Sequence, residues 1–231
     1  MIDISAAWRS THPGAALGVI AMHDIQTPGH STQLDQKKIA LETQLRDIYR
    51  DHDRSSILEI PAMQAYTAYY KRFKKTYHLL LQLESIAHKN KSIPQGPALV
   101  QAMFMAELDS LLLTAGHDLS HIETPIQLDS CRGDEVYTLL RGDSVTCKSG
   151  DMVTSDQQGV FCSVIYGQDL RTRITNDTQN VLYVVYVPAG IKPEVIELHL
   201  QDLEHNVKLA FPDAKTTFRE IYFANSASDI R

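Results

Sequence analysis

The stretch Val181-Leu182-Tyr183-Val184-Val185-Tyr186-Val187 decides how this chain can fold, because it contains no polar alternation. Seven consecutive residues that are β-branched, aromatic or leucine are typical of a strand buried on both faces. Such a strand needs a neighbour on each side, so we place residues 181–187 at the centre of a sheet. The run is far too short to cross a bilayer as a helix, which takes about 20 apolar residues.

Shorter runs with strand character lie upstream of this stretch, and turn signals separate them. Arg141-Gly142-Asp143 and Ser149-Gly150-Asp151 mark two of the turns, because glycine and aspartate adopt turn conformations at low cost. The strand-rich part therefore extends over about residues 125–190. We expect its other strands at residues 135–140, 144–147, 152–154 and 160–166.

The sequence upstream of the strand-rich part has the apolar periodicity of helices. Ser31 or Thr32 can cap the first helix, since a side-chain oxygen there accepts an unpaired backbone N–H. Pro61 suits the first turn of the second helix, and a third helix follows it. The fourth begins near Pro97 and is apolar on most sides. It can end at Gly116, because glycine tolerates the left-handed conformation of a helix end.

Two further elements complete the expected architecture. An early strand at residues 15–22 closes at the turn-rich Thr27-Pro28-Gly29, and a C-terminal helix covers about residues 193–209. Helices first and strands later is the order of an α+β fold. We expect one domain over residues 1–231, with its helical part at about 31–120.

Charge is spread unevenly along the chain. The net charge is −6, which argues mildly against a dedicated nucleic-acid binder. Residues 66–93 nevertheless carry six bases and one acid, a net of +5, so the rest of the chain carries −6 − 5 = −11. Such a segment is either a phosphate-facing patch or a solvated helix surface, and charge alone leaves both open.

Cysteine content and the N-terminus indicate the compartment. The three cysteines Cys131, Cys147 and Cys162 are an odd number at wide spacing, so a disulfide framework is not expected and a reducing environment fits. The first residues have no basic stretch followed by an apolar one. We expect a cytoplasmic protein that does not interact with a membrane.

The common motifs of metal, nucleotide and nucleophile sites are incomplete in this sequence. His117, Asp118 and His121 lie close together, but no paired Cys-x-x-Cys and no His-Glu-x-x-His supports them as zinc ligands. No Gly-x-Ser-x-Gly elbow and no glycine-rich phosphate loop is present. We therefore expect neither a metal nor a cofactor.

Two polar groups of residues are candidates for a ligand site. His117 and Asp118 follow the expected buried helix and can line a pocket, or Asp118 can simply cap the next turn. Arg171 and Arg173 alternate, so on a strand both would project to one side and hold a carboxylate or phosphate. They can equally be exposed charges at a sheet edge that deter strand pairing.

These residues form part of an ordered series over about residues 10–190 that resembles the B3/B4 domain of the phenylalanyl-tRNA synthetase β-subunit. The closest resemblance is to free-standing proteins built on that domain. The series consists of His12-Pro13-Gly14 through Ala21, Tyr70-Lys71-Arg72-Phe73, Gly116-His117-Asp118-Leu119, Gly133-Asp134-Glu135-x-Tyr137, Gly159-Val160-x-Cys162, and Arg171-Thr172-x-Ile174-Thr175-x-x-Thr178-x-Asn180.

The resemblance implies a three-layer fold, with an unusual β-sandwich flanked by helices and a pocket between the layers. It implies a tRNA-associated binding domain and, as its reaction, hydrolysis of misacylated tRNA in trans, mainly by positioning the ester and a water. It gives no reason to expect ligase activity. The pocket residues would be His117, Asp118, Arg171, Arg173 and Thr175. The residues meeting tRNA phosphates would be Lys71, Arg72, Lys74 and Lys75.

Two positions depart from the family pattern. Ala115 stands where the synthetase domain has a histidine, and Val184 stands where it has the glutamate that helps to recognise a tyrosine hydroxyl. Valine accepts no hydrogen bond, so a site that has lost this partner discriminates differently. The alternative hypothesis is therefore a pocket for a free amino acid or other metabolite, held through Arg171 and Arg173 without RNA.

Overall fold

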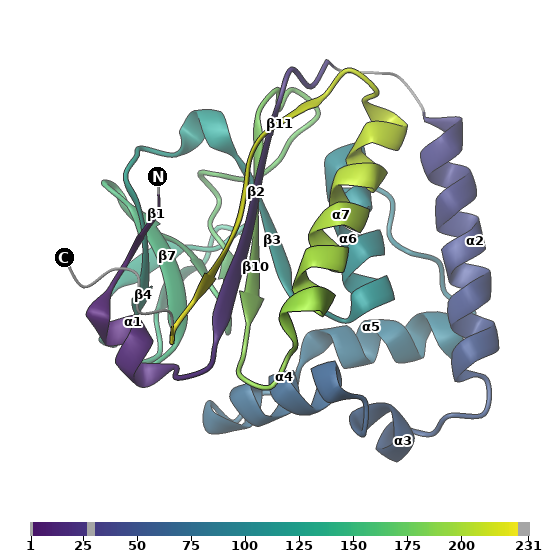
Figure 1. Cartoon of the computed structure of the whole chain (residues 1–231), viewed down its shortest axis with the longest axis horizontal. Coiled ribbons are helices and arrows are strands. Elements are labelled where there is room, and N and C mark those ends of the chain that lie inside the picture. Colours follow the sequence, from purple (N-terminus) through teal and green to yellow (C-terminus); the bar gives the residue numbers. More distant parts are fainter. Residues whose placement is uncertain (1, 27–30, 226–231) are drawn as a thin grey trace.

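The computed structural model describes residues 2–26 and 31–225, so the expected turn at Thr27-Pro28-Gly29 lies outside the described residues. Figure 1 shows three layers: a group of helices, a four-stranded sheet against it, and a five-stranded sheet beyond. The expected α+β class with two sheets and flanking helices is therefore confirmed. That residues 1–231 form one domain stays a prediction.

The four-stranded sheet is built around the apolar stretch of residues 181–187. Its order is β11 (Lys215–Phe223), β2 (Ala16–His23), β10 (Val181–Val187) and β3 (Thr114–Asp118). Strand β10 pairs antiparallel with β2 on one side and with β3 on the other, and each of its residues is buried. The central position that we predicted for residues 181–187 is thus confirmed.

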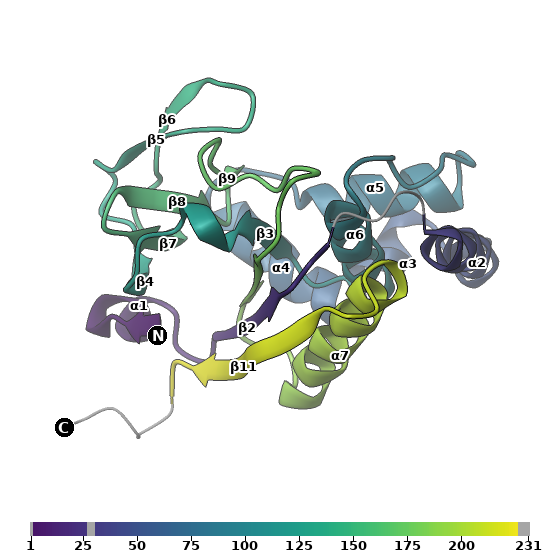
Figure 2. The ribbon, with the colours of Figure 1, turned by 90° about the horizontal axis from the view of Figure 1, so that it is seen from above.

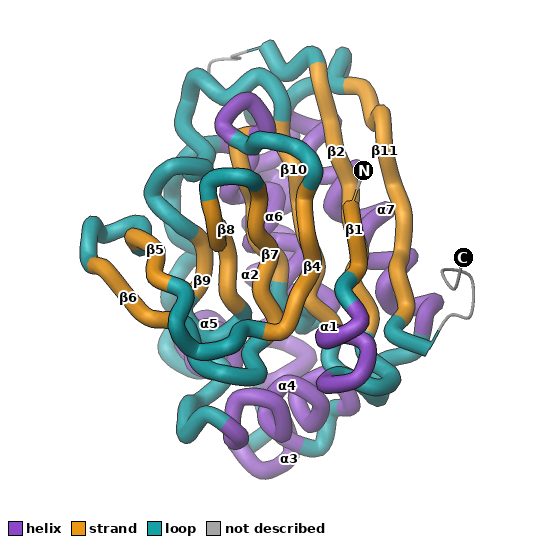
Figure 3. Tube along the Cα trace, turned by 90° about the vertical axis from the view of Figure 1, so that its left-hand side faces the viewer, coloured by secondary structure: helices purple, strands orange, loops and turns teal. Residues whose placement is uncertain are grey.

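The second sheet combines a strand near the N-terminus with short strands from the middle of the chain. Its order is β1 (Ile2–Ile4), β4 (Ile126–Ser130), β7 (Met152–Asp156), β8 (Gly159–Ser163) and β9 (Gly167–Gln168). The strands β5 (Val136–Thr138) and β6 (Ser144–Thr146) form a separate hairpin at the side of this sheet, as Figure 3 shows.

Most of the helices lie on the face of the four-stranded sheet that is turned away from the five-stranded sheet (Figure 2). Ser31 caps the first long helix by accepting the Leu34 N–H at 3.3 Å, and Pro61 occupies the first turn of the next, as expected. Among the described residues, no helix is long and apolar enough to span a membrane. The helical elements are α1 (Ala6–Thr11), α2 (Thr32–Tyr49), α3 (Arg54–Leu58), α4 (Pro61–Arg72), α5 (His78–Ala87), α6 (Ala98–Ser110), the 3-10 turn η1 (Leu119–His121) and α7 (Pro193–Ala210).

The end of the buried helix was predicted wrongly. Helix α6 ends at Ser110, where Leu111 takes a left-handed conformation with φ of 64°. The chain then enters strand β3, which contains Gly116, so this glycine is not a helix end. The apolar sequence continues through the break without a local signal, because β3 is specified by its pairing with β10.

Helix α4 joins the layers through tyrosine hydroxyl groups. Tyr66 donates to the Tyr186 carbonyl at 2.6 Å and accepts the Leu113 N–H at 2.9 Å. One turn further along the helix, Tyr70 donates to the Val164 carbonyl at 2.8 Å. Each of these bonds is buried, so each satisfies backbone groups that water cannot reach. The bonds fix α4 against both sheets.

Candidate functional site

The structure brings the five predicted pocket residues together around the end of β3. Four of them belong to a network of internal hydrogen bonds, namely His117, Asp118, Arg171 and Thr175. His117 and Asp118 lie on β3, and an isolated bridge joins His117 to Arg173. The expected strand through Arg171 and Arg173 is wrong, because residues 171–180 form turns around that single bridge. The two arginines therefore do not project as an alternating pair.

His117 is a fully buried, neutral imidazole between the two sheets. Its ring meets Phe161 edge-on, with centroids 4.8 Å apart. Thr172 donates its hydroxyl to Asp169, so it accepts from the Nδ1–H of His117 at 2.7 Å, which fixes the tautomer. Burial, with a smaller effect of Arg171, lowers the pKa of His117 to about 3.

Asp118 has the local role that the sequence left open. One carboxylate oxygen accepts the Ser120 N–H at 3.0 Å and so caps η1. The other oxygen accepts the Thr178 hydroxyl at 2.8 Å. Thr178 in turn accepts the N–H of Thr175 at 3.0 Å. Asp118 and Thr175 thus hold the 171–180 loop against β3.

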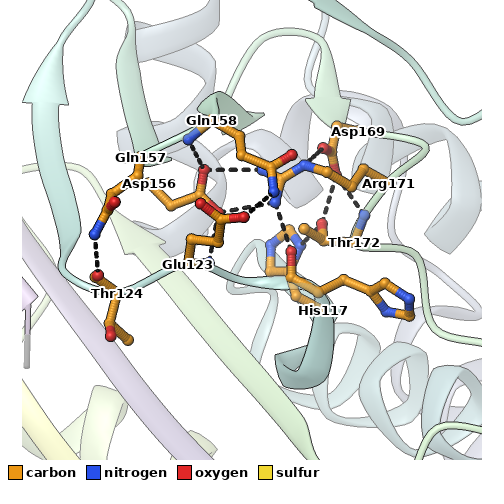
Figure 4. Close-up of polar contacts among 10 residues, drawn as sticks. His117, Glu123, Thr124, Asp156, Gln157, Gln158, Asp169, Arg171 and Thr172 are labelled. Atoms are coloured by element: carbon orange, nitrogen blue, oxygen red, sulfur yellow. Dashed lines mark hydrogen bonds and ion pairs between the residues drawn. The ribbon is translucent and has the colours of Figure 1, made fainter.

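Arg171 is committed to an internal ion pair (Figure 4). Its two terminal nitrogens donate to the two oxygens of Asp156 at 2.8 and 3.0 Å, and one of them also donates to the His121 carbonyl. Burial alone would raise the pKa of Asp156, but the bonds from Arg171 and from backbone N–H groups lower it overall. This guanidinium fork is occupied and does not face an open site.

A cavity of about 490 Å³ lies beside β3, between the helices and the β8–β9 segment. Tyr70 of α4, His78 of α5 and Glu107 of α6 line it together with residues 113–116 and 162–168. Among the five residues predicted from the sequence, Arg173 is the one that lines this cavity. A volume of this size is in the range of small-molecule sites, about 300–1,000 Å³.

Glu107 is the chemically distinctive residue of the cavity, and it is not among the residues predicted from the sequence. The side chain is 1% exposed, and one carboxyl oxygen accepts the Thr114 N–H at 2.7 Å. Burial raises the pKa of Glu107 to about 8, although the Thr114 bond works in the opposite direction. The helix is mostly apolar and carries two acids, Glu107 and Asp109. An acid in such a helix is the signal that could have found Glu107, because unpaired acids are rarely buried.

The other groups at the cavity wall offer no ready nucleophile. Cys162 lines the cavity, and burial raises its pKa to about 12, so its thiol stays protonated at neutral pH. No group of three or more His, Cys, Asp or Glu side chains in the described part of the chain could hold a metal ion.

The predicted phosphate-binding residues lie at and beyond the end of α4. The Lys75 ammonium group is 5.6 Å from the centroid of the Tyr166 ring, and Tyr166 lines the cavity. Arg72 instead lies over the rings of Tyr69 and Phe73, at 5.4 and 5.5 Å. Within residues 2–26 and 31–225, neither Lys75 nor Arg72 forms an ion pair, and the same holds for Lys71 and Lys74.

The fold and the cavity define an α+β domain with a ligand-sized space between its helices and its sheets. The model of the B3/4 domain family matches residues 64–206, more than half of the chain, and the chain belongs to this family. No sequence among curated proteins matches it.

One similar solved structure is an N-terminal fragment of the phenylalanyl-tRNA synthetase beta-subunit from Pyrococcus horikoshii, with 12% identity and a TM-score of 0.48. The match covers 96% of this chain and 53% of that chain, so the chain spans about half of its length.

The structure also locates the two positions that depart from the family pattern. Ala115 on β3 and Val184 on β10 are directly paired in the sheet, so their side chains point to the same face. Both are buried and apolar. The polar character of the cavity therefore comes from other elements, with Glu107 on α6 as its acid.

Proposed function

We propose that this protein binds tRNA through the basic residues at and beyond the end of α4 and receives the aminoacyl group in the cavity beside β3. Hydrolysis of the misacylated ester in trans is the reaction that this arrangement would serve. The position of Lys75 carries the proposal, because its ammonium group lies over Tyr166 at the cavity wall. A phosphate held there would bring an attached group to the cavity. The cytoplasmic location expected from the sequence stays a prediction.

The catalytic contribution of the protein would be positional. The thiol of Cys162 is protonated, and His117 lies between the sheets and outside the set of residues that line the cavity. Holding an ester and a water in a reactive geometry can by itself supply a large part of a rate enhancement. The proposal therefore assigns recognition to the cavity and affinity to the lysines.

A gel shift with bulk tRNA over a series of salt concentrations tests the proposal. We expect Lys74→Glu/Lys75→Glu to weaken binding and to flatten its dependence on salt, since each lost phosphate contact removes about 0.7–0.9 from the log–log slope. The matched control is Lys192→Glu/Lys215→Glu, which changes the net charge equally at exposed positions elsewhere.

If both double variants weaken binding equally, the assignment to the α4 end is wrong. If the unmodified protein binds no tRNA even at low salt, the tRNA function is wrong. The second candidate, a pocket for a free amino acid or metabolite, would then take its place. The paired apolar residues Ala115 and Val184 favour this candidate, because they remove the polar partners of the family site.

A further inference from the structure

The interior of the cavity beside β3 has one acid and several aromatic faces. Glu107 is the sole acidic residue among those that line it. Its carboxyl makes one hydrogen bond to the described residues, the bond from the Thr114 N–H. The carboxyl therefore keeps acceptor positions that no side chain in the described ranges uses. A buried carboxyl with unused acceptors gains strongly from a donor that brings positive charge.

The aromatic residues of the cavity favour the same kind of ligand. Tyr70, Phe104, Tyr166 and Tyr186 all line it. The negative face of an aromatic ring attracts a cation, and Lys75 over the Tyr166 ring shows this attraction at the wall of this cavity. A carboxyl together with several rings forms a suitable environment for an ammonium group on an apolar body.

We infer that the cavity selects primary amines, whose ammonium group pairs with the free acceptors of Glu107 while an apolar body packs against the aromatic wall. This inference rests on the proposed function only in taking the cavity as the ligand site, and it adds the class of ligand. An aminoacyl ester and a free amino acid both carry such a group. Glu107 is in this role a binding residue.

Binding of an ammonium ion is coupled to release of a proton. Because the pKa of Glu107 is about 8, the carboxyl of the empty cavity is mostly protonated at pH 7. To form the ion pair it must pass its proton to the buffer, while the amine keeps its own. Affinity therefore rises with pH up to about pH 8, where ionisation of the carboxyl no longer costs free energy.

The groups around Glu107 do not change charge near pH 8. Burial raises the pKa values of Tyr66 on α4 and of Tyr77 before α5 far above it. His199 on α7, which meets Glu107 through Thr114, has a pKa lowered to about 4 by burial. At the cavity wall, burial lowers the pKa of His78 from its usual value. A transition near pH 8 thus belongs to Glu107.

The remaining titratable or charged groups that line the cavity keep their state as well. The thiol of Cys162 has a pKa of about 12, and burial raises the pKa values of the phenols of Tyr70 and Tyr186. Arg173 contributes a guanidinium to the cavity wall. The pH dependence of amine binding should therefore show one proton.

Isothermal titration with 2-phenylethylamine and 2-phenylethanol tests the inference, because these probes differ only in the amino or hydroxyl group. We expect amine affinity to rise about tenfold from pH 6 to pH 7 and about fivefold more to pH 8, with uptake of about one proton by the buffer. Affinity for the alcohol should not depend on pH. Glu107→Gln should weaken amine binding at least about tenfold and leave alcohol binding unchanged.

Retained binding of the alcohol shows that the cavity of the variant is intact, so weaker binding of the amine is not a result of unfolding. Equal affinity for amine and alcohol, amine binding unchanged in Glu107→Gln, or no binding of the amine at all would each overturn the inference. The tRNA gel shift separates this failure from that of the proposed function. Glu107→Gln leaves Lys74 and Lys75 unchanged. If the protein binds tRNA but does not bind amines, only the inferred class of ligand is refuted, and the proposed tRNA function stands.

Discussion

Replacing Glu107 with glutamine should change how the free energy of unfolding depends on pH. The carboxyl has an ordinary pKa of 4.5 in the unfolded chain and about 8 in the folded protein. The folded state therefore holds the proton more tightly. The stability contributed by this group is complete below pH 4.5 and is lost as the pH rises towards 8.

The size of the effect follows from the pKa difference. The full slope of about 1.4 kcal/mol per pH unit applies once the unfolded carboxyl is ionised, and at pH 4.5 it is only half ionised. Between pH 4.5 and pH 7 the wild type therefore loses about 3 kcal/mol. Glutamine cannot ionise, although its carbonyl can still accept the Thr114 N–H. The difference in unfolding free energy between Glu107→Gln and wild type should therefore move by about 3 kcal/mol in favour of the variant.

Urea unfolding at both pH values measures this difference, and any offset that is the same at both values cancels. Glu84→Gln is the control with the opposite sign, because the bonds from Arg54 lower the pKa of Glu84. That variant should lose stability relative to wild type as the pH rises. A Glu107→Gln difference that is constant within the roughly 10–15% uncertainty of such extrapolations would refute the burial argument.

Two further predictions concern packing around the cavity. Tyr66→Phe should cost about 1–3 kcal/mol in urea unfolding, because the buried Leu113 N–H and Tyr186 carbonyl lose their partner; a loss near zero would mean that neither group depends on the hydroxyl. Gly116→Ala should cost about 1–3 kcal/mol and lower the melting temperature, since its Cβ would stand 2.7 Å from Ile174 Cδ1 and 3.0 Å from Tyr183 Cε1. Gly96→Ala, with nothing within 4 Å, is the control, and equal melting temperatures would contradict this reasoning.

The sequence was most informative where one local signal was enough. The stretch 181–187 is apolar on both faces, and β10 has the neighbours on both sides that this pattern predicts. Ser31 and Pro61 mark helix starts because capping and the missing N–H of proline are local effects. Elements with weak local patterns, such as β3, β9 and β11, were not predicted.

The candidate site was less predictable, because its residues acquire their roles from partners far away in the chain. Arg171 forms an ion pair with Asp156, and Asp118 accepts a hydrogen bond from Thr178. No spacing in the sequence indicates either pair. Arg173 reaches the cavity, whereas the neighbouring arginine does not. Glu107 was read only as part of an apolar helix, since its burial depends on the packing of α6 beside β3.

The sequence by itself therefore determined the α+β class, the central strand and the basic segment over residues 66–93, which begins within α4. Apolar periodicity and charge can be recognised from residues that are close together in the chain. The tertiary structure alone decided which polar groups face the cavity and which form internal hydrogen bonds that hold loops in place. Strand register and helix packing join residues such as Glu107 and Thr114, or Ala115 and Val184, and their protonation and environment follow from that contact.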